Sequence, residues 1–316
     1  MSILRPFSRV PRVLCIAFAA AVAGGCASAG TTTDPTRVDG TSYAAGRVLS
    51  IPRPFEVGIV STDEDEYGAA FEPDGRTLYF VRRLTAGQSE QILFSRFTRG
   101  RWQTARLAGF SGTAYFDGDP GISPDGRRIV FASNRPLVSG QPTRTIDLWT
   151  LSRAARGWGS VERMEHVNSD AADEDPTLST TALYFSSNRF GGLGGYDLWR
   201  SAATQNGFAA ATALGAPVNS EGDETDPHVA PDESYLLFVA DRVGGAGGRD
   251  LWVTYRSGDS WSTPEPLSGV NTGEDEYAPA VTPDGRYLFF TRGRPGNLLQ
   301  MDIAATGIRT TSAPAP

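Results

Sequence analysis

A column of acidic residues recurs along this chain, each just ahead of a short apolar strand. Its members are Glu66, Asp117, Asp173, Glu224 and Glu276. In three copies a second acid follows two positions later, as Asp119, Asp175 and Asp226. Carboxylates brought to one place repel one another unless positive charge lies nearby. The pattern therefore predicts an acidic ring that binds a divalent cation such as Ca²⁺, or a basic segment of a partner.

A repeated arginine offers a structural alternative for the same acids. It falls at or close to four residues after the last phenylalanine of the following strand, at Arg83, Arg135, Arg189, Arg242 and Arg294. A repeated acid and a repeated arginine most simply form a repeated ion pair that holds neighbouring strands together. We expect this structural role for most of the ring, and departures from the repeat are then the better indicators of function.

Three further side chains lie beside the acidic column. His228 replaces a small residue of the other copies and would be a ligand or a base if it faces a channel. A hydrogen-bonded histidine with no chemical role is the alternative. Tyr67 and Tyr277 directly follow two of the acids, where they would either stack on a sugar or close the opening.

Short strands and turns must position these residues. The predicted ends of the strands that follow the acids, from Glu72 to Thr282, recur at spacings of 51, 56, 51 and 52 residues. A period near fifty residues, built only of strands and turns, is typical of a β-propeller. In such a ring the strands that follow the acids lie innermost, so the acidic column is predicted to surround one mouth of a central channel.

Five such units predict an all-β fold with a single five-bladed propeller over residues 46–304. The fifth unit ends before its outer strand, while residues 53–58 resemble the outer strand of the fourth unit. The N-terminal segment is therefore predicted to complete the last blade and close the ring. A six-bladed ring would need residues 30–52 to form most of a blade, which their small, polar composition disfavours.

The repeat resembles a known family. Its elements are acid-x-Asp-Pro, Ser-Pro-Asp-Gly, Leu-Tyr-Phe, Gly-Gly and Asp-Leu-Trp, and together they are similar to the WD-like repeat of TolB-type propellers over roughly residues 53–303. The resemblance implies the propeller fold. TolB itself has six blades and an additional N-terminal domain, so its particular partners are not carried over to a chain that matches only the repeat.

Most signatures of catalysis are missing from the sequence. It contains no Gly-x-Ser-x-Gly, no His-Glu-x-x-His and no lysine, which excludes Schiff-base chemistry and a P-loop lysine. The enzymatic alternative is a glycosidase or a metal-dependent polysaccharide lyase that uses the channel-mouth carboxylates. Glycosidases need two carboxyl groups in unequal environments, which five equivalent acids on a repeating motif fit poorly.

The N-terminus indicates export. Residues 1–25 combine three arginines with an apolar run that is too short to span a bilayer, which is typical of a signal peptide. The run ends in Ala23-Gly24-Gly25-Cys26, which resembles the lipobox of bacterial lipoproteins. That resemblance implies cleavage before Cys26, a lipid on Cys26 and sorting to the outer membrane, facing the periplasm. The alternative is a soluble periplasmic protein. Residues 26–45 are predicted to be a flexible tether and residues 305–316 a disordered tail.

These observations favour a lipid-anchored envelope propeller that binds without catalysing a reaction. Its net charge of −7 argues against nucleic acid and anionic lipid as partners. We expect a monomer whose partner is an envelope protein or a cationic peptide segment, with the membrane contacted through the lipid alone. No cofactor is implied with certainty, and Ca²⁺ at the acidic ring is the candidate.

Overall fold

The computed structural model describes residues 48–84, 90–138, 140–141 and 144–310. The predicted signal peptide, Cys26, the predicted tether over residues 26–45, and residues 311–316 of the predicted tail lie outside the described residues. The described part contains 23 strands and one short 3₁₀ helix. None of its helices has the length and apolarity needed to cross a membrane.

The strands form five antiparallel sheets, each a blade, numbered here in chain order. Blade 1 contains β2 (Asp65–Phe71), β3 (Thr77–Arg83), β4 (Glu90–Thr98), β5 (Arg101–Trp102) and β6 (Arg106–Leu107). Blade 2 contains β7 (Asp117–Ile122), β8 (Arg128–Ser133), β9 (Asp147–Ser152) and β10 (Glu162–Arg163). Blade 3 contains β11 (Asp173–Leu178), β12 (Ala182–Ser187), β13 (Asp197–Thr204), β14 (Gly207–Phe208) and β15 (Thr212–Ala213). Blade 4 contains β16 (Glu224–Val229), β17 (Tyr235–Ala240), β18 (Asp250–Ser257), β19 (Ser260–Trp261) and β20 (Glu265–Pro266). Blade 5 contains β21 (Glu276–Val281), β22 (Tyr287–Arg292), β23 (Asn297–Asp302) and β1 (Arg53–Pro54).

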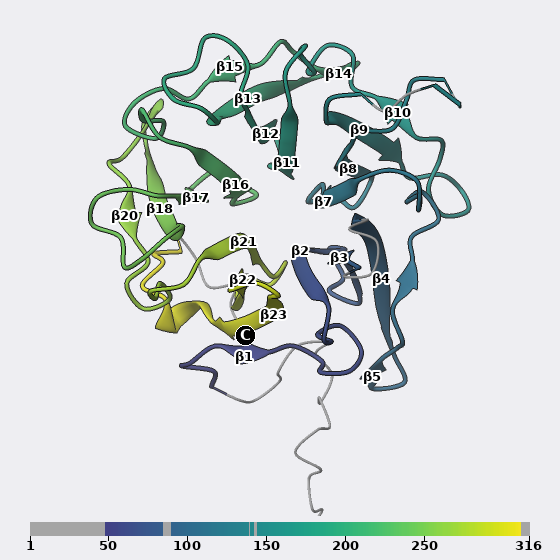
Figure 1. Ribbon diagram of the computed structural model, residues 1–316, viewed down its shortest axis with the longest axis horizontal. Helices are drawn as coiled ribbons and strands as arrows, with labels where there is room; N and C mark the ends of the chain where they lie inside the picture. Colours follow the sequence, from purple (N-terminus) through teal and green to yellow (C-terminus); the bar gives the residue numbers. More distant parts are fainter. Residues whose placement is uncertain (1–47, 85–89, 139, 142–143, 311–316) are drawn as a thin grey trace, which may run out of the picture. The chain divides into compact units, whose positions relative to one another are not determined.

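The five blades are arranged around a common axis (Figure 1). The innermost strand of each blade contacts the innermost strands of both neighbours, in the order β2, β7, β11, β16, β21 and back to β2. The predicted five-bladed propeller is therefore confirmed. The second strand of each blade is almost wholly buried, because it packs against neighbouring blades on both faces of its sheet.

The N-terminal segment closes the ring, as predicted. β1 pairs antiparallel with β23, so that Arg53 lies opposite Gln300 and Pro54 opposite Leu299. The next residue, Phe55, is buried against Trp102 of blade 1 and Phe289 of blade 5, with ring centroids 5.5 and 5.0 Å away. The first and last parts of the repeat region are thus joined by strand pairing and by an aromatic cluster, and β1 supplies the outer strand of blade 5.

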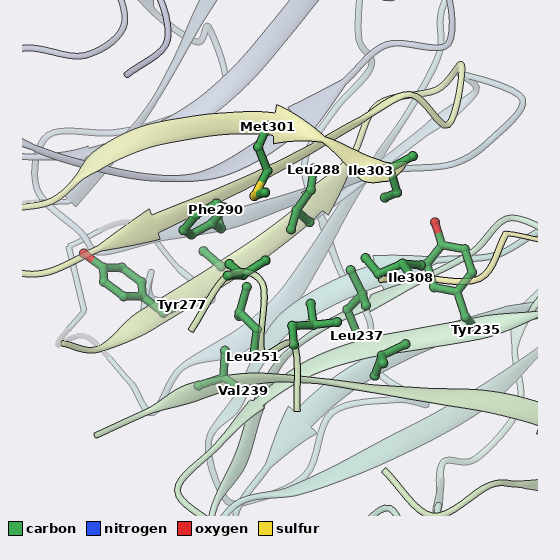
Figure 2. Close-up of a cluster of buried hydrophobic side chains, with 14 of the residues drawn as sticks. Tyr235, Leu237, Val239, Leu251, Tyr277, Leu288, Phe290, Met301, Ile303 and Ile308 are labelled. Carbon is green, nitrogen blue, oxygen red and sulfur yellow. The ribbon is translucent and has the colours of Figure 1, made fainter. Parts of the chain in front are cut away.

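The chain remains packed beyond residue 304, which extends the predicted propeller boundary. The 3₁₀ helix η1 (Ile303–Ala305) follows β23, and Ile308 is buried in a hydrophobic cluster shared by blades 4 and 5 (Figure 2). In this cluster Leu237 of β17 and Leu251 of β18 lie beside Phe290 of β22. Ile303 and Ile308 both pack into this cluster and hold residues 303–308 against the propeller. The polar residues around them in the sequence did not indicate this packing.

One departure from the repeat has a structural explanation. Glu233 replaces the turn glycine of blade 4 and adopts a left-handed φ of 58°. Its carboxylate accepts hydrogen bonds from Ser179 and Tyr184 of blade 3, each at 2.8 Å. Burial opposes ionisation of Glu233, but the hydrogen bonds that its carboxylate accepts outweigh burial and lower its pKa to about 2. The short turn of blade 3 and Glu233 of blade 4 are therefore two departures from the repeat that contact each other.

Candidate functional site

A cavity of about 430 Å³ lies on the axis between the five innermost strands. Its walls are mostly small or apolar, and a column of prolines recurs in four blades, at Pro120, Pro176, Pro227 and Pro279. Exposed prolines of the Pro-Asp turns, among them Pro73, Pro231 and Pro283, form its rim. Of the described residues that line it, three carry a carboxylate and none is an arginine. We call this space the central cavity.

A bulge in every innermost strand directs one residue toward this cavity. Counting from the first acid of the motif as the first residue, the pairing with the second strand shifts between the second and the fifth residue. In β11 these are Glu174 and Thr177. The residue in the shift has a left-handed φ of 50–65° in all five blades, at Gly68, Asp119, Asp175, Asp226 and Ala278. Aspartate tolerates this conformation better than most residues, and a proline after it suits a position where ladder pairing is interrupted.

The three aspartates of this column, called here the cavity carboxylates, interact with one another. Burial, together with the charges of Asp175 and Asp226, raises the pKa of Asp119. The backbone N–H of Asp226 donates to Asp175 at 3.1 Å, and the Ser186 hydroxyl also donates to Asp175. Asp226 in turn accepts from the Thr225 hydroxyl at 3.0 Å. The carboxylates of blades 2, 3 and 4 therefore form one connected group.

Burial and mutual repulsion hold protons on this group. Burial, followed by the charge of Asp175, raises the pKa of Asp226 to about 7 and that of Asp119 well above its usual value. Burial likewise raises the pKa of Glu174 to about 7, even though Tyr196 donates to its carboxylate at 2.9 Å. The group is thus partly protonated at neutral pH and would gain from a bound positive charge.

His228 lines the same cavity. Its Nε2 accepts a hydrogen bond of 3.2 Å from the backbone N–H of Val281 on the neighbouring blade. Burial lowers the pKa of His228 to about 4, so the ring is neutral at physiological pH. A neutral imidazole with one nitrogen already occupied is a polar contact in the cavity wall, and it adds no charge there.

The other acidic column has a different environment. Glu66, Asp117, Asp173, Glu224 and Glu276 are fully buried, and each forms an ion pair with an arginine of the same blade. Their partners are Arg82, Arg135, Arg189, Arg242 and Arg292. Arg82 and Arg292 thus replace the predicted Arg83 and Arg294. The reason is register, since Arg82 lies directly opposite Glu66 and Arg292 directly opposite Glu276 across the strand pair.

Each of these pairs also holds the segment that enters the blade from its predecessor. In blade 5, Glu276 accepts from the backbone and hydroxyl of Thr272 at 3.0 and 2.6 Å, while Arg292 donates to the carbonyl of Val270 at 2.6 Å. Equivalent serine or threonine donors and carbonyl acceptors complete the other four pairs. We call this arrangement the acid–arginine clamp. Its carboxylates are already bonded on every side and are separated from the cavity.

The remaining predicted residues lie near the ends of the innermost strands at which those strands begin. Tyr67 and Tyr277 are buried with ring centroids 6.0 Å apart, and neither lines the central cavity. Tyr67 donates to Glu90, and Tyr277 donates to Asp65 at 3.0 Å. Arg83 bonds to Asp65 and Glu90, whereas Arg294 stacks over Tyr277 at 5.1 Å. The two tyrosines are therefore held in the interior, between blades 1 and 5, by charged neighbours.

The described part of the chain contains no group of three or more histidine, cysteine or acidic side chains arranged to hold a metal ion. Of the eight predicted acids, five belong to the clamp and three face the cavity. The bulge that separates the two sets was missed in the sequence. The signal for it was the recurring Asp-Pro dipeptide, because proline within a strand favours a bulge.

Comparison with solved structures identifies the fold. A protein designated TolB from Agrobacterium tumefaciens superimposes with a TM-score of 0.50 at 17% sequence identity, over 79% of this chain and 81% of that one. The fold is that of a TolB-like β-propeller. TolB from Acinetobacter baumannii gives a TM-score of 0.48 at 16% identity, over 75% of this chain, which spans 54% of that protein. The Hadza microbial sialidase Hz136 gives 0.45 at 10% identity, over 78% of this chain and 67% of that one. No protein-family model and no curated protein sequence matches this chain.

The cavity carboxylates make the stability of this TolB-like propeller pH-dependent. Because the folded-state pKa of Asp226 lies above its unfolded value, the folded state holds a proton that the unfolded state has lost. Stability should therefore fall as the pH rises from about 4 to about 7. We expect Asp226→Asn to raise the free energy of unfolding at pH 8.5 by on the order of 1–2 kcal/mol, with little change at pH 4.

Urea denaturation at the two pH values measures this effect. Asp259→Asn is the matched control, since Asp259 is exposed in the turn between β18 and β19 and should leave stability unchanged at both pH values. A loss of stability at pH 8.5 in Asp226→Asn would contradict the account, because it would mean that the ionised carboxylate stabilises the fold.

Proposed function

We propose that this chain is a non-catalytic binding module of the bacterial cell envelope, and that its central cavity receives a basic side chain from an extended segment of a partner protein. The observation that carries the proposal is the cavity itself. It is of the size that holds small ligands and it reaches solvent at the proline rim. Among the described residues that line it, the charged groups are three carboxylates, with no arginine.

The chemistry of the walls supports a lysine or arginine side chain as the occupant. Proline, alanine and aliphatic side chains suit the methylene stem of such a residue, and the cavity carboxylates suit its charged head. A bound cation would offset the mutual repulsion that raises the pKa values of Asp119 and Asp226. Binding would then release protons, because a positive neighbour favours the ionised carboxylates.

The cavity is less suited to the glycan-active alternative. A glycosidase divides the work between one acid that is protonated and another that is ionised, placed on opposite sides of the scissile bond. Here Asp119, Asp175 and Asp226 come from adjacent blades and gather at one place, where the backbone N–H of Asp226 donates to Asp175, and His228 is neutral. Degradation of a glycan by the wild-type protein is therefore the result that would favour the enzymatic alternative.

Calorimetric titration with short peptides tests this function. Peptides with blocked ends that differ only by lysine or norleucine at one central position isolate the charge of the side chain. We expect the lysine peptides to bind and the norleucine peptides to bind at least tenfold more weakly, a difference of about 1.4 kcal/mol. The Asp175→Asn/Asp226→Asn double variant should lose this preference, whereas Asp259→Asn should keep it.

Absence of any charge preference would contradict the proposal. Degradation of a polysaccharide by the wild-type protein, abolished in the double variant, would replace the proposal with the glycan-active enzyme. The double variant and Asp259→Asn each replace one carboxylate oxygen per side chain with an amide nitrogen. Urea denaturation shows whether each variant is folded.

We further propose that the module is anchored to the outer membrane through Cys26 and faces the periplasm. The support is the sequence Ala23-Gly24-Gly25-Cys26 after a basic and apolar leader. Mass spectrometry of the chain expressed in a Gram-negative host should find a mature protein that begins at Cys26 and carries the mass of a lipid. An unmodified chain cut at another position would favour the soluble periplasmic alternative.

A further inference from the structure

A second hollow lies beside the central cavity, between blades 2 and 3. It has a volume of about 730 Å³ and is lined by the turn between β7 and β8, the end of β9, and the turns that flank β12 and β13. Ser123, Pro124 and Leu178 line both hollows, so the two adjoin. We call this second hollow the arginine groove.

Three arginines and a single aspartate supply the charged side chains of the arginine groove. Arg153 is committed to the fold, since it pairs with Glu72 at 2.7 Å, donates to the carbonyl of Gly126 and stacks over Trp158. Arg127 and Arg128 differ, because neither forms an ion pair with any other residue in the described part of the chain. In this acidic protein the guanidinium groups of Arg127 and Arg128 can therefore still pair with a carboxylate.

Arg128 is held in place by groups that leave its charge uncompensated. Its guanidinium lies over the ring of Phe208 on blade 3, 5.5 Å from the centroid, and donates to the Thr150 hydroxyl at 3.4 Å. Asp125, the groove's one aspartate, is already bonded by the Ser123 hydroxyl at 2.6 Å and by the backbone N–H of Arg127. A half-buried arginine that stacks on an aromatic ring retains in-plane donors for a carboxylate.

Two departures from the repeat meet at this groove. The position of Arg128, the first residue of the second strand, holds an uncharged residue in every other blade, namely Thr77, Ala182, Tyr235 or Tyr287. On the opposite side, blade 3 has a turn two residues shorter than the others, and its Ser179 and Thr180 line the groove. The short turn is already explained by its contact with Glu233, so Arg128 is the departure that the fold does not explain.

We propose that the arginine groove binds a carboxylate of the same partner segment whose basic side chain enters the central cavity. This inference rests on the proposed function and adds that the segment carries an acidic residue near the basic one. An extended chain that crosses the shared residues Ser123 and Pro124 would place the two side chains in adjoining, oppositely charged sites. Guanidinium groups bind carboxylates with two parallel hydrogen bonds, which makes the contact directional.

Fluorescence anisotropy with labelled peptides tests the inference on the full chain. All peptides have blocked ends and one central lysine, and a series adds one glutamate at two to five positions on either side. We expect one spacing to bind at least about fivefold more tightly than the lysine-only peptide. The gain should fall to near onefold in Arg127→Gln/Arg128→Gln and persist in Arg101→Gln, an exposed arginine in β5 of blade 1.

The outcomes separate the two proposals. If the lysine-only peptide binds and no glutamate position adds affinity, the arginine groove is not a carboxylate site and the proposed function stands. A gain that persists in the double variant would also overturn the inference. If neither peptide type binds, both proposals fall. Tetragalacturonate that binds more tightly than every peptide, and only while Arg127 and Arg128 are present, would assign the groove to an acidic saccharide and overturn the peptide assignment. Arg127→Gln alone, at an exposed position, guards against misfolding of the double variant.

Discussion

The buried acid–arginine clamp is the interaction on which the rest of the structure depends. An ionised carboxylate removed from water is very unfavourable unless a cation and hydrogen-bond donors surround it. Each clamp supplies both, and in doing so fixes three segments at once: the innermost strand, the second strand and the entry from the previous blade. Asp173 and Arg189 show the arrangement in blade 3, where the arginine also stacks over Phe185 and Trp199. Repetition of the clamp in every blade explains why its acids recur so regularly.

Two residues further along three of the five innermost strands, the same repeat has the opposite electrostatic character. The bulge turns Asp119, Asp175 and Asp226 into the central cavity, whose wall contains no arginine among the residues that the structure describes. Burial in the cavity raises the pKa values of these three aspartates. In the clamp, each carboxylate forms an ion pair with a guanidinium group. A group of buried acids that lowers stability at neutral pH is hard to explain as a device of the fold. It is readily explained as a site whose missing positive charge belongs to a ligand.

Much of the fold could be predicted from the sequence, because strand period, turn chemistry and the unfinished fifth unit are all local patterns. The closing of blade 5 by residues 53–54 followed from such a pattern. The division of the acids between the clamp and the cavity could not be predicted in this way. Asp173 lies before the bulge and Asp175 lies within it, and the sequence did not reveal the bulge. Register also decided the partners, as Arg82 rather than Arg83 faces Glu66. The arginine groove depends on two blades meeting, so neither Arg128 nor the short turn of blade 3 indicated it alone.

The measurement that tests this account most directly compares Asp173→Asn with Asp175→Asn at pH 8, by urea denaturation and by titration with a lysine peptide. The account predicts that Asp173→Asn lowers the free energy of unfolding by about 3 kcal/mol or more, because it leaves Arg189 buried without its partner. It predicts that Asp175→Asn keeps or raises stability while weakening peptide binding. Equal tolerance of both changes, or a stability loss confined to Asp175→Asn, would contradict the division between clamp and cavity.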